Sequence, residues 1–199
     1  WKNSAPVFAD LDGDADLDLL VGNQQGSIQY WENKGSFEFA EFIYNPTPFI
    51  GVTGGRNSVP AVIDLNADGV NDLLVGNFLG QLYKYVRTES SAGFRFRLEI
   101  RKYLNLDVGL GSVPQIADLN NDQLPDLIIG SDSGKIISFQ IDPKKTGSIS
   151  WKPNPEYFKE LNLPVGGNPV FVDLDNDGDL DLIVGSEAGT LYYFRNTGR

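Results

Sequence analysis

Three amino acids that carry much of protein chemistry are missing from this 199-residue chain, which contains no cysteine, no methionine and no histidine. The lack of cysteine excludes a disulfide framework and thiol chemistry, and the lack of both cysteine and histidine excludes a zinc site of the usual type. Nucleophile–base pairs that depend on histidine are excluded as well. Because no initiator methionine is present, we expect a processed or excised piece of a longer protein.

Long hydrophobic runs and net positive charge are also lacking. No apolar stretch approaches the roughly 18 residues that indicate a membrane span, so we expect no membrane insertion. The formal net charge of −11 argues against nucleic acid as a partner. Hydrophobic residues make up 41% of the chain, which is enough for a core, and we expect residues 1–199 to form a single domain or a fragment of one.

Aspartate, in contrast, is abundant and concentrated. Of the 19 aspartates, 16 lie in four nine-residue windows whose first residues are 54, 54 and 55 positions apart. The windows span residues 10–18, 64–72, 118–126 and 173–181. A constant interval of this size indicates repeated supersecondary units. The predicted repeats extend approximately over residues 4–57, 58–111, 112–166 and 167–199.

The residues around each window predict strands. A proline stands four residues before each window and opens a short apolar stretch, a position that suits the first residue of a strand. A continuous apolar run follows each window, and a glycine-bounded turn leads to a third strand. The connectors 37–44, 94–103 and 149–151 predict a fourth strand, which the last repeat lacks. The pattern predicts an all-β fold of four-stranded propeller blades with about 15 strands, either four-bladed or part of a larger propeller.

Each window also has the oxygen-bearing side chains of a calcium loop. Calcium takes six to eight oxygen ligands in a flexible geometry. Side chains at positions 1, 3, 5 and 9 can converge on one ion, with the backbone carbonyl of position 7 (Asp16, Val70, Leu124 or Asp179) as a further ligand. The predicted ligands of up to four Ca²⁺ are Asp10, Asp12, Asp14, Asp16, Asp18, Asp64, Asn66, Asp68, Val70, Asp72, Asp118, Asn120, Asp122, Leu124, Asp126, Asp173, Asp175, Asp177, Asp179 and Asp181.

Two alternatives for these windows were weighed. An EF-hand needs a glutamate at position 12, where this chain has an aliphatic residue in every window. Asp-rich turns also occur without any metal, but four copies with the same spacing favour a metal site. We expect the third loop to bind most weakly, because Gln123 replaces a turn glycine and Pro125 restricts the backbone.

These motifs resemble the FG-GAP/VCBS repeats found in the β-propeller of integrin α-subunits. The "GAP" element is similar to Ser4-Ala5-Pro6, Ser58-Val59-Pro60, Ser112-Val113-Pro114 and Gly167-Asn168-Pro169. The chain departs from the family pattern in having four repeats, where integrin-type rings have seven, and in lacking a clear Phe-Gly before "GAP". The resemblance implies a propeller with calcium in hairpin loops on one face, and a secreted or cell-surface protein.

Three functions were compared. The first is a non-enzymatic adhesion or interaction module with structural calcium, which binds a protein or glycan ligand on the cell surface or matrix. The second is a lectin that uses Tyr30, Tyr83, Tyr192, Tyr193 or Trp151, with the Tyr30 position favoured as surface material. The third is a polysaccharide lyase or hydrolase, although the carboxylates outside the windows form no recognisable catalytic pair in the sequence. The incomplete fourth blade is a further candidate binding site, either for the remainder of a larger propeller or for another chain.

Overall fold

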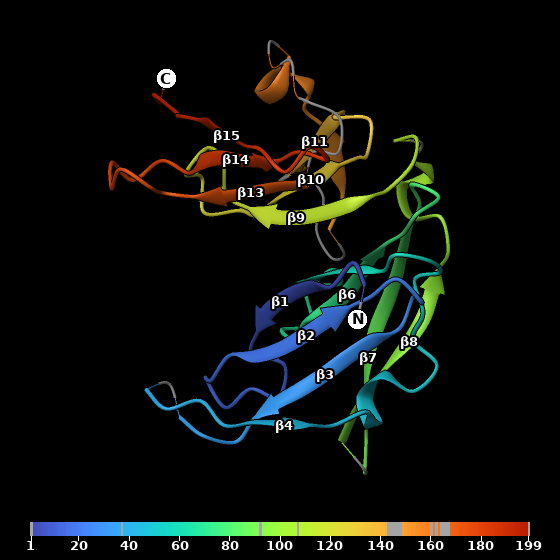
Figure 1. Cartoon of the computed structure of the whole chain (residues 1–199). Helices are drawn as coiled ribbons and strands as arrows, with labels where there is room; N and C mark the ends of the chain where they lie inside the picture. Colours follow the sequence, from blue (N-terminus) through green and yellow to red (C-terminus); the bar gives the residue numbers. More distant parts are fainter. Residues whose placement is uncertain are drawn as a thin grey trace.

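The chain is folded into four antiparallel sheets, one from each repeat. The structure, a computed structural model, describes residues 2–36, 38–91, 93–106, 108–142, 149–159, 161, 163 and 168–198 (Figure 1). The first sheet comprises β1 (Ala5–Ala9), β2 (Asp18–Gly22), β3 (Ile28–Asn33) and β4 (Phe42–Tyr44). The second comprises β5 (Val59–Ile63), β6 (Asp72–Gly76), β7 (Leu82–Ser90) and β8 (Gly93–Ile100). The third comprises β9 (Val113–Ala117), β10 (Asp126–Gly130), β11 (Ile136–Ile141) and β12 (Trp151–Pro153). The fourth comprises β13 (Asn168–Val172), β14 (Asp181–Gly185) and β15 (Leu191–Phe194).

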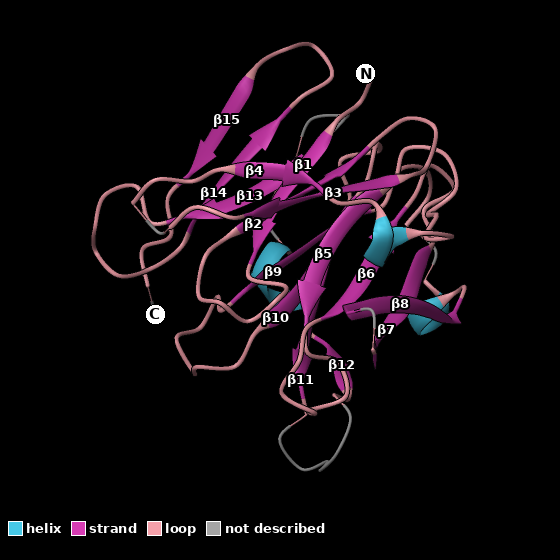
Figure 2. Cartoon of the chain, turned by 90° about the horizontal axis from the view of Figure 1, so that it is seen from below, coloured by secondary structure: helices cyan, strands magenta, loops and turns pink. Residues whose placement is uncertain are grey.

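The four sheets are the blades of a four-bladed β-propeller, which is one of the two arrangements that the sequence leaves open. We number them blades 1 to 4 in chain order. Within each blade the strands follow one another in sequence order, and the fourth blade has three described strands. Short 3-10 helices at Thr47–Phe49, Tyr103–Asn105 and Pro155–Phe158 lie in the connectors between blades (Figure 2). None of the helices in the described part of the chain is long and apolar enough to cross a membrane.

The first strand of each blade contacts the first strand of the next, so that β1, β5, β9 and β13 form a continuous series. The second strands lie in the middle of each sheet. In β6 and β10 every residue is buried, which explains why these segments are uninterrupted apolar runs in the sequence. One hydrophobic core joins blade 1 to blade 2, and a second joins blade 2 to blade 3.

Two aromatic positions of the third strands were predicted, with different outcomes. The residues Trp31, Tyr85, Phe139 and Phe194 share one position of the third strand, and this position is predicted to pack between blades. Tyr85 and Phe139 are buried as predicted, whereas Trp31 and Phe194 are half-buried. The position shared by Tyr30, Lys84, Ser138 and Tyr193 is expected at the surface, and this prediction is wrong in blades 1 to 3. Tyr30 is 0% exposed, and Lys84 and Ser138 are also buried, whereas Tyr193 in blade 4 is 49% exposed. In the first three blades the position is therefore covered whatever its chemistry.

Neighbouring blades approach each other closely at a glycine that ends the second strand. A Cβ atom on Gly22 would lie 2.1 Å from the backbone oxygen of Ser58, and one on Gly76 would lie 2.1 Å from that of Ser112. The serine also forms hydrogen bonds across the interface. The Ser58 Oγ accepts from the Asn23 N–H at 3.0 Å and donates to the Ser27 carbonyl at 2.9 Å.

The second interface repeats the same bonds. The Ser112 Oγ accepts from the Asn77 N–H at 2.8 Å and donates to the Gln81 carbonyl at 2.6 Å. The glycine after the apolar run and the serine of the Ser-x-Pro element are therefore two halves of one contact. Their recurrence in the sequence is explained by the packing of one blade on the next.

This contact predicts a difference between two equivalent glycines. Gly76→Ala places a methyl group against backbone atoms and should lower the free energy of unfolding by about 1–3 kcal/mol. Gly185→Ala is the matched control, since only the side chain of Leu191 lies near, at 3.8 Å, and it should change stability by less than about 0.5 kcal/mol. Urea unfolding at low protein concentration measures both, and equal losses would contradict this account of the contact.

Candidate metal sites

The four aspartate windows form four loops, each joining the first and second strands of a blade. We number them loops 1 to 4. The strand pairs begin next to the loop, since Ala9 pairs with Asp18 and Ile63 pairs with Asp72, and the third and fourth blades repeat this register. The ninth residue of every window is thus the first residue of a buried strand, and the rest of the window forms the loop at the end of the blade.

The loops share one backbone shape. Positions 4 and 6 have positive φ in every loop, between 57° and 93°. The residues are Gly13 and Ala15, Ala67 and Gly69, Asn121 and Gln123, and Asn176 and Gly178. Gln123 adopts a φ of 66°, a region that residues other than glycine rarely occupy. Because the third window has no glycine, this backbone conformation is less favourable in loop 3 than it would be with glycine at that position.

Aspartate side chains hold this shape by accepting backbone hydrogen bonds. The carboxylate of the first aspartate accepts the N–H of the sixth residue at 2.8–3.0 Å in all four loops. The fifth residue, also aspartate, accepts the N–H of the seventh at 2.8–3.0 Å. These bonds leave other lone pairs of the same carboxylates free, because each carboxylate has about four acceptor positions.

The ninth aspartate has a different environment, since it is buried in every blade. In blade 2, Asp72 accepts the N–H of Leu65 at 3.2 Å and that of Arg87 at 2.9 Å. It thereby ties the loop to the third strand. Asp18 and Asp181 form the same pair of bonds and also accept a tyrosine hydroxyl, from Tyr30 and Tyr193, at 2.8 Å.

Loops 1 and 4 bring three carboxylates together. Oxygen atoms of Asp10, Asp12 and Asp18 lie within 4.8 Å of one another, and those of Asp173, Asp175 and Asp177 do the same. Such a separation suits hard cations that bind oxygen ligands. The two triads differ in composition, since the first includes the buried ninth aspartate and the second is drawn from the first, third and fifth positions.

The charge in loop 1 is not fully compensated by protein groups. Burial, together with the charges of Asp18 and Asp14, raises the pKa of Asp12 to about 6. Burial also raises the pKa of Asp18, against the opposing effect of its three hydrogen bonds. A raised pKa means that the negative form is disfavoured as the site stands, so a bound cation would stabilise it.

Loops 2 and 3 contain an asparagine where loops 1 and 4 contain a third carboxylate. The Asn66 Nδ2 donates to Asp68 at 2.9 Å, and the Asn120 Nδ2 donates to Asp122 at 2.9 Å. The amide therefore partly compensates the neighbouring charge. Among the residues that the structure describes, neither loop forms a triad of carboxylates like those of loops 1 and 4. Burial still raises the pKa of Asp126, in loop 3, to about 6.

Loop 4 has a cation of its own, which the sequence patterns did not reveal. The Arg195 Nε lies 2.5 Å from Asp175, and its Nη2 lies 3.2 Å from Asp177. The backbone hydrogen bond from Asp179, followed by the contact with Arg195, lowers the pKa of Asp177. The equivalent residue of blade 1 is Glu32, so this third-strand position carries opposite charges beside the two triads. Comparison of the third strands across repeats would have found it.

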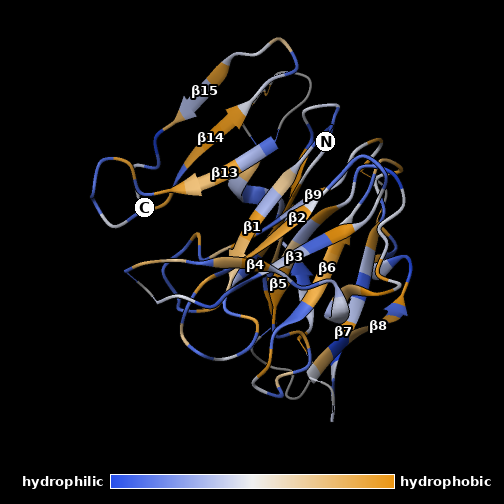
Figure 3. Ribbon diagram, turned by 60° about the horizontal axis from the view of Figure 1, so that its bottom comes forward, coloured by the Kyte–Doolittle hydropathy of each residue, from blue (hydrophilic) through white to orange (hydrophobic). Residues whose placement is uncertain are grey.

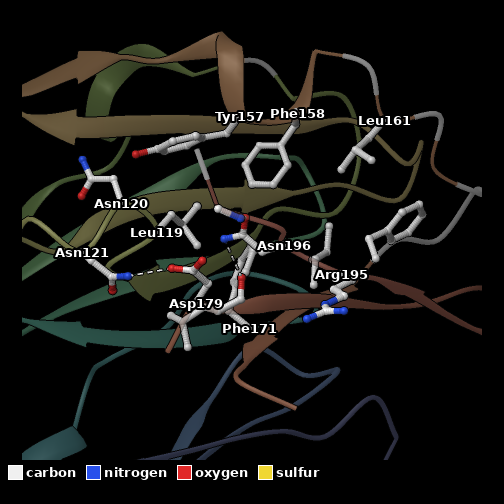
Figure 4. A pocket seen from close by; sticks show the side chains of 14 residues that line it. Leu119, Asn120, Asn121, Tyr157, Phe158, Leu161, Phe171, Asp179, Arg195 and Asn196 are labelled. Carbon is white, nitrogen blue, oxygen red and sulfur yellow. Dashed lines mark hydrogen bonds between the residues drawn. The ribbon is translucent and has the colours of Figure 1, made fainter. Parts of the chain in front are cut away.

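Adjacent loops are also connected. The Asn71 Nδ2 donates to the Asp10 carbonyl at 3.2 Å, which links loop 2 to loop 1. The Asn121 Nδ2 donates to Asp179 at 2.8 Å, which links loop 3 to loop 4 (Figure 4). The loops therefore lie side by side at one end of the blades, and a change in one loop is coupled directly to its neighbour.

A cleft of about 480 Å³ opens beside loops 3 and 4, between the third and fourth blades. It is lined by the aromatic rings of Tyr157, Phe158 and Phe171, with the Phe158 and Phe171 ring centres 6.1 Å apart, and by polar side chains that include Asn120 and Arg195 (Figure 4). Aromatic faces combined with amide and guanidinium groups can bind a ligand that is part apolar and part polar. None of the five aromatic residues proposed from the sequence for sugar binding lines this cleft.

Four consecutive antiparallel sheets, each with an aspartate loop between its first two strands, define a repeat-built β-propeller. A family model described as an FG-GAP-like repeat matches residues 5–75 and 118–184, which is more than half of the chain. The chain belongs to the FG-GAP-like repeat family. The resemblance noted from the sequence is confirmed.

The buried ninth aspartate and the exposed aspartates of a loop should contribute differently to the free energy of unfolding. Asp72→Ala leaves two backbone N–H groups near the core without their acceptor and should lower the free energy of unfolding by about 2–4 kcal/mol in EGTA. Asp68→Ala, in the exposed part of the same loop, should cost less than about 1 kcal/mol under the same conditions. Urea unfolding in EGTA checks both, and a comparable loss for Asp68→Ala would contradict the assignment of separate roles.

Proposed function

We propose that this chain is an extracellular, calcium-stabilised, non-enzymatic interaction module that binds a protein or glycan ligand. The observation that carries the proposal is the carboxylate triad of loop 1. Its oxygens lie within 4.8 Å of one another, and the pKa of Asp12 is raised to about 6 by burial and by its acidic neighbours. The donor set consists only of oxygen, as calcium prefers.

The residues that would hold calcium are the side chains at positions 1, 3, 5 and 9 of each window. In loop 1 these are Asp10, Asp12, Asp14 and Asp18. Bound calcium would neutralise these carboxylates and connect the ends of the first two strands. The chain's own bonds already set the loop backbone, so the ion would bind to a site that is largely formed before it arrives.

Two physical arguments support an extracellular setting. Extracellular calcium modules typically bind with dissociation constants of about 10⁻⁴–10⁻³ M, which match the calcium concentration outside cells. At about ten times its dissociation constant, a ligand that binds only the folded state stabilises it by roughly 1.4 kcal/mol. Four loops that act in this way would decide whether the blades stay folded, and calcium would then have a structural role.

The surface that binds the ligand is proposed from the cleft beside loops 3 and 4. Its aromatic walls and amide groups support either a glycan or a peptide segment as ligand. A lectin that stacks sugar on Tyr30 has no support, since that ring is fully buried. Because the cleft shares Asn120, Asn121 and Asp179 with the loops, calcium would also fix the shape of this surface.

Calcium should raise the melting temperature of the protein. We expect a rise of roughly 10 °C or more in millimolar calcium relative to excess EGTA, because several loops would each contribute on the order of 1 kcal/mol or more. Differential scanning calorimetry measures the shift. The variant Asp12→Asn, Asp175→Asn removes one carboxylate from each triad and should lose about half of it.

Magnesium at the same concentration is the control and should give a much smaller rise, because it requires a smaller and more regular site. An equal rise with both ions would indicate a general effect of divalent cations and not a calcium site. No rise with either ion would contradict a structural role for calcium. Glycan arrays and matrix-protein binding assays in calcium and in EGTA test the interaction role. Binding that persists unchanged in EGTA would separate ligand recognition from the loops.

Arg195 should lower the calcium affinity of loop 4, because its guanidinium binds Asp175 and Asp177 and carries the same charge as the ion. Arg195→Gln should strengthen calcium binding at this loop about three- to tenfold. Calorimetric titration is made in a background with Asp14, Asp68 and Asp122 changed to Ala, which impairs the other loops.

The matched control is Arg97→Gln, which removes the same charge from an exposed position on β8. It should leave the affinity of loop 4 unchanged. An equal gain in both variants would indicate that only the net charge matters, and no gain in either would show that Arg195 does not compete with calcium.

A further inference from the structure

The outermost strand of blade 2 is much longer than its counterparts in the neighbouring blades. β8 has eight residues, whereas β4 and β12, the outermost strands of blades 1 and 3, have three residues each. Figure 1 shows β8 on the outer side of β7. Because blade 2 lies between blades 1 and 3, this edge belongs to the rim of the propeller and not to either end of the blade series.

The backbone of β8 has hydrogen-bonding groups that face away from the blade. The Arg95 carbonyl accepts the hydroxyl of Thr88 at 3.2 Å, so this carbonyl faces β7. The Gly93 carbonyl, two residues earlier, also accepts a side-chain hydroxyl of β7, at 2.7 Å. Backbone groups alternate in direction along an antiparallel strand, which turns those of Phe94 and Phe96 outward. Among the described strands only β7 pairs with β8, so the outward groups can pair with a further strand.

The side chains of β8 alternate between the core and the solvent. Phe94 and Phe96 are buried in the core that joins blades 1 and 2, and Arg95 and Arg97 between them are exposed. Residues 93–102 contain four basic residues and one acidic residue, in a chain whose net charge is −11. Figure 3 shows the β7–β8 hairpin at the border of the molecule, with strongly hydrophilic residues beside apolar ones. This edge is therefore a basic strip on an acidic protein.

The two arginines of the strip are not neutralised by the chain itself. The acidic residue of the segment, Glu99, forms an ion pair with Lys84 at 2.8 Å. Arg95 and Arg97 form no ion pair with any residue that the structure describes. Side chains two residues apart on a strand lie about 7 Å from each other on the same face. The two positive charges therefore repel each other, and a ligand with negative charges at the same spacing would relieve this repulsion.

The charges determine which kind of strand this edge can accept. A second copy of β8 would place arginine beside arginine, which is unfavourable, and charged side chains commonly protect edge strands in this way. An acidic strand would instead form pairs of opposite charge at every second position. A polyanion without a peptide backbone would satisfy the arginines but would not pair with the outward backbone groups. The combination of both features favours an acidic peptide segment.

We propose that the edge of β8 binds an extended acidic segment of a partner protein, which adds to blade 2 as a fifth, antiparallel strand. The backbone of Phe94 and Phe96 would form hydrogen bonds with the segment, and Arg95 and Arg97 would pair with carboxylates at alternate positions. In strand addition of this kind, backbone bonds give affinity and side chains give specificity. The cleft beside loops 3 and 4 has no lining residue from β8, so this surface is separate from it and does not depend on calcium.

The proposal is tested with an eight-residue peptide in which glutamate alternates with threonine. Fluorescence anisotropy of the labelled peptide measures its binding in constant millimolar calcium. The double variant Arg95→Glu, Arg97→Glu should weaken binding at least tenfold and should gain binding of the peptide that has lysine in place of glutamate. The matched control is Lys135→Glu, Lys152→Glu, which makes the same change of charge at exposed positions of blade 3 and should bind like the parent.

Two modified peptides separate strand addition from attraction by charge alone. In the proposed pairing the threonines lie opposite Phe94 and Phe96, so that their N–H groups donate to β8, whereas the glutamate N–H groups face away. Methylation of the threonine nitrogens should therefore weaken binding at least tenfold, and methylation of the glutamate nitrogens should have little effect. Circular dichroism and urea midpoints confirm that the double variants are folded, and Arg95→Gln with Arg97→Gln replaces the first variant if it is not.

Three results would overturn the proposal. The first is a parent chain that does not bind the glutamate peptide. The second is an equal loss of binding in both double variants, since only the net charge of the protein would then matter. The third is equal binding of the two methylated peptides, with competition by dextran sulfate, which would make the strip a site for sulfated polysaccharides and not for a strand.

Discussion

A buried carboxylate at the ninth position of each window is the interaction on which loop and blade both depend. It accepts the backbone of its own loop on one side and, in blades 1, 2 and 4, the backbone at the end of the third strand on the other. Burying an unpaired charge is costly, whereas a charge that accepts several hydrogen bonds is tolerated. These bonds are made by the chain alone, so they set the backbone of the loop without a cation.

The blades are joined by a second contact that is independent of the loops. Glycine permits close approach of the backbones, and the serine hydroxyl satisfies groups from both blades at that point. This contact lies at the other end of the second strand from the loop. The aspartate loop and the blade-packing contact are thus separated by one buried strand and can vary separately in sequence.

Sequence reasoning identified the repeats, the strands and the candidate loops, because each has a short-range signature that recurs four times. It failed where the environment comes from another blade. Tyr30, Lys84 and Ser138 differ in chemistry, and only the neighbouring blade shows that they share a buried position. Arg195 was missed for a related reason, since it lies 18 residues or more from the carboxylates that it contacts. The cleft between blades 3 and 4 could not be predicted, because it depends on how two sheets meet.

The first strands contact one another in series, from β1 through β5 and β9 to β13. A fold built in this way behaves as a row of units whose stability is the sum of each unit and its interfaces with its immediate neighbours. Blade 4 has three described strands, where each of the other blades has four, and its residues Leu174, Leu191 and Tyr193 are 56%, 75% and 49% exposed. Local opening should begin there, and the cleft at its border would then lie next to the most easily opened part of the molecule.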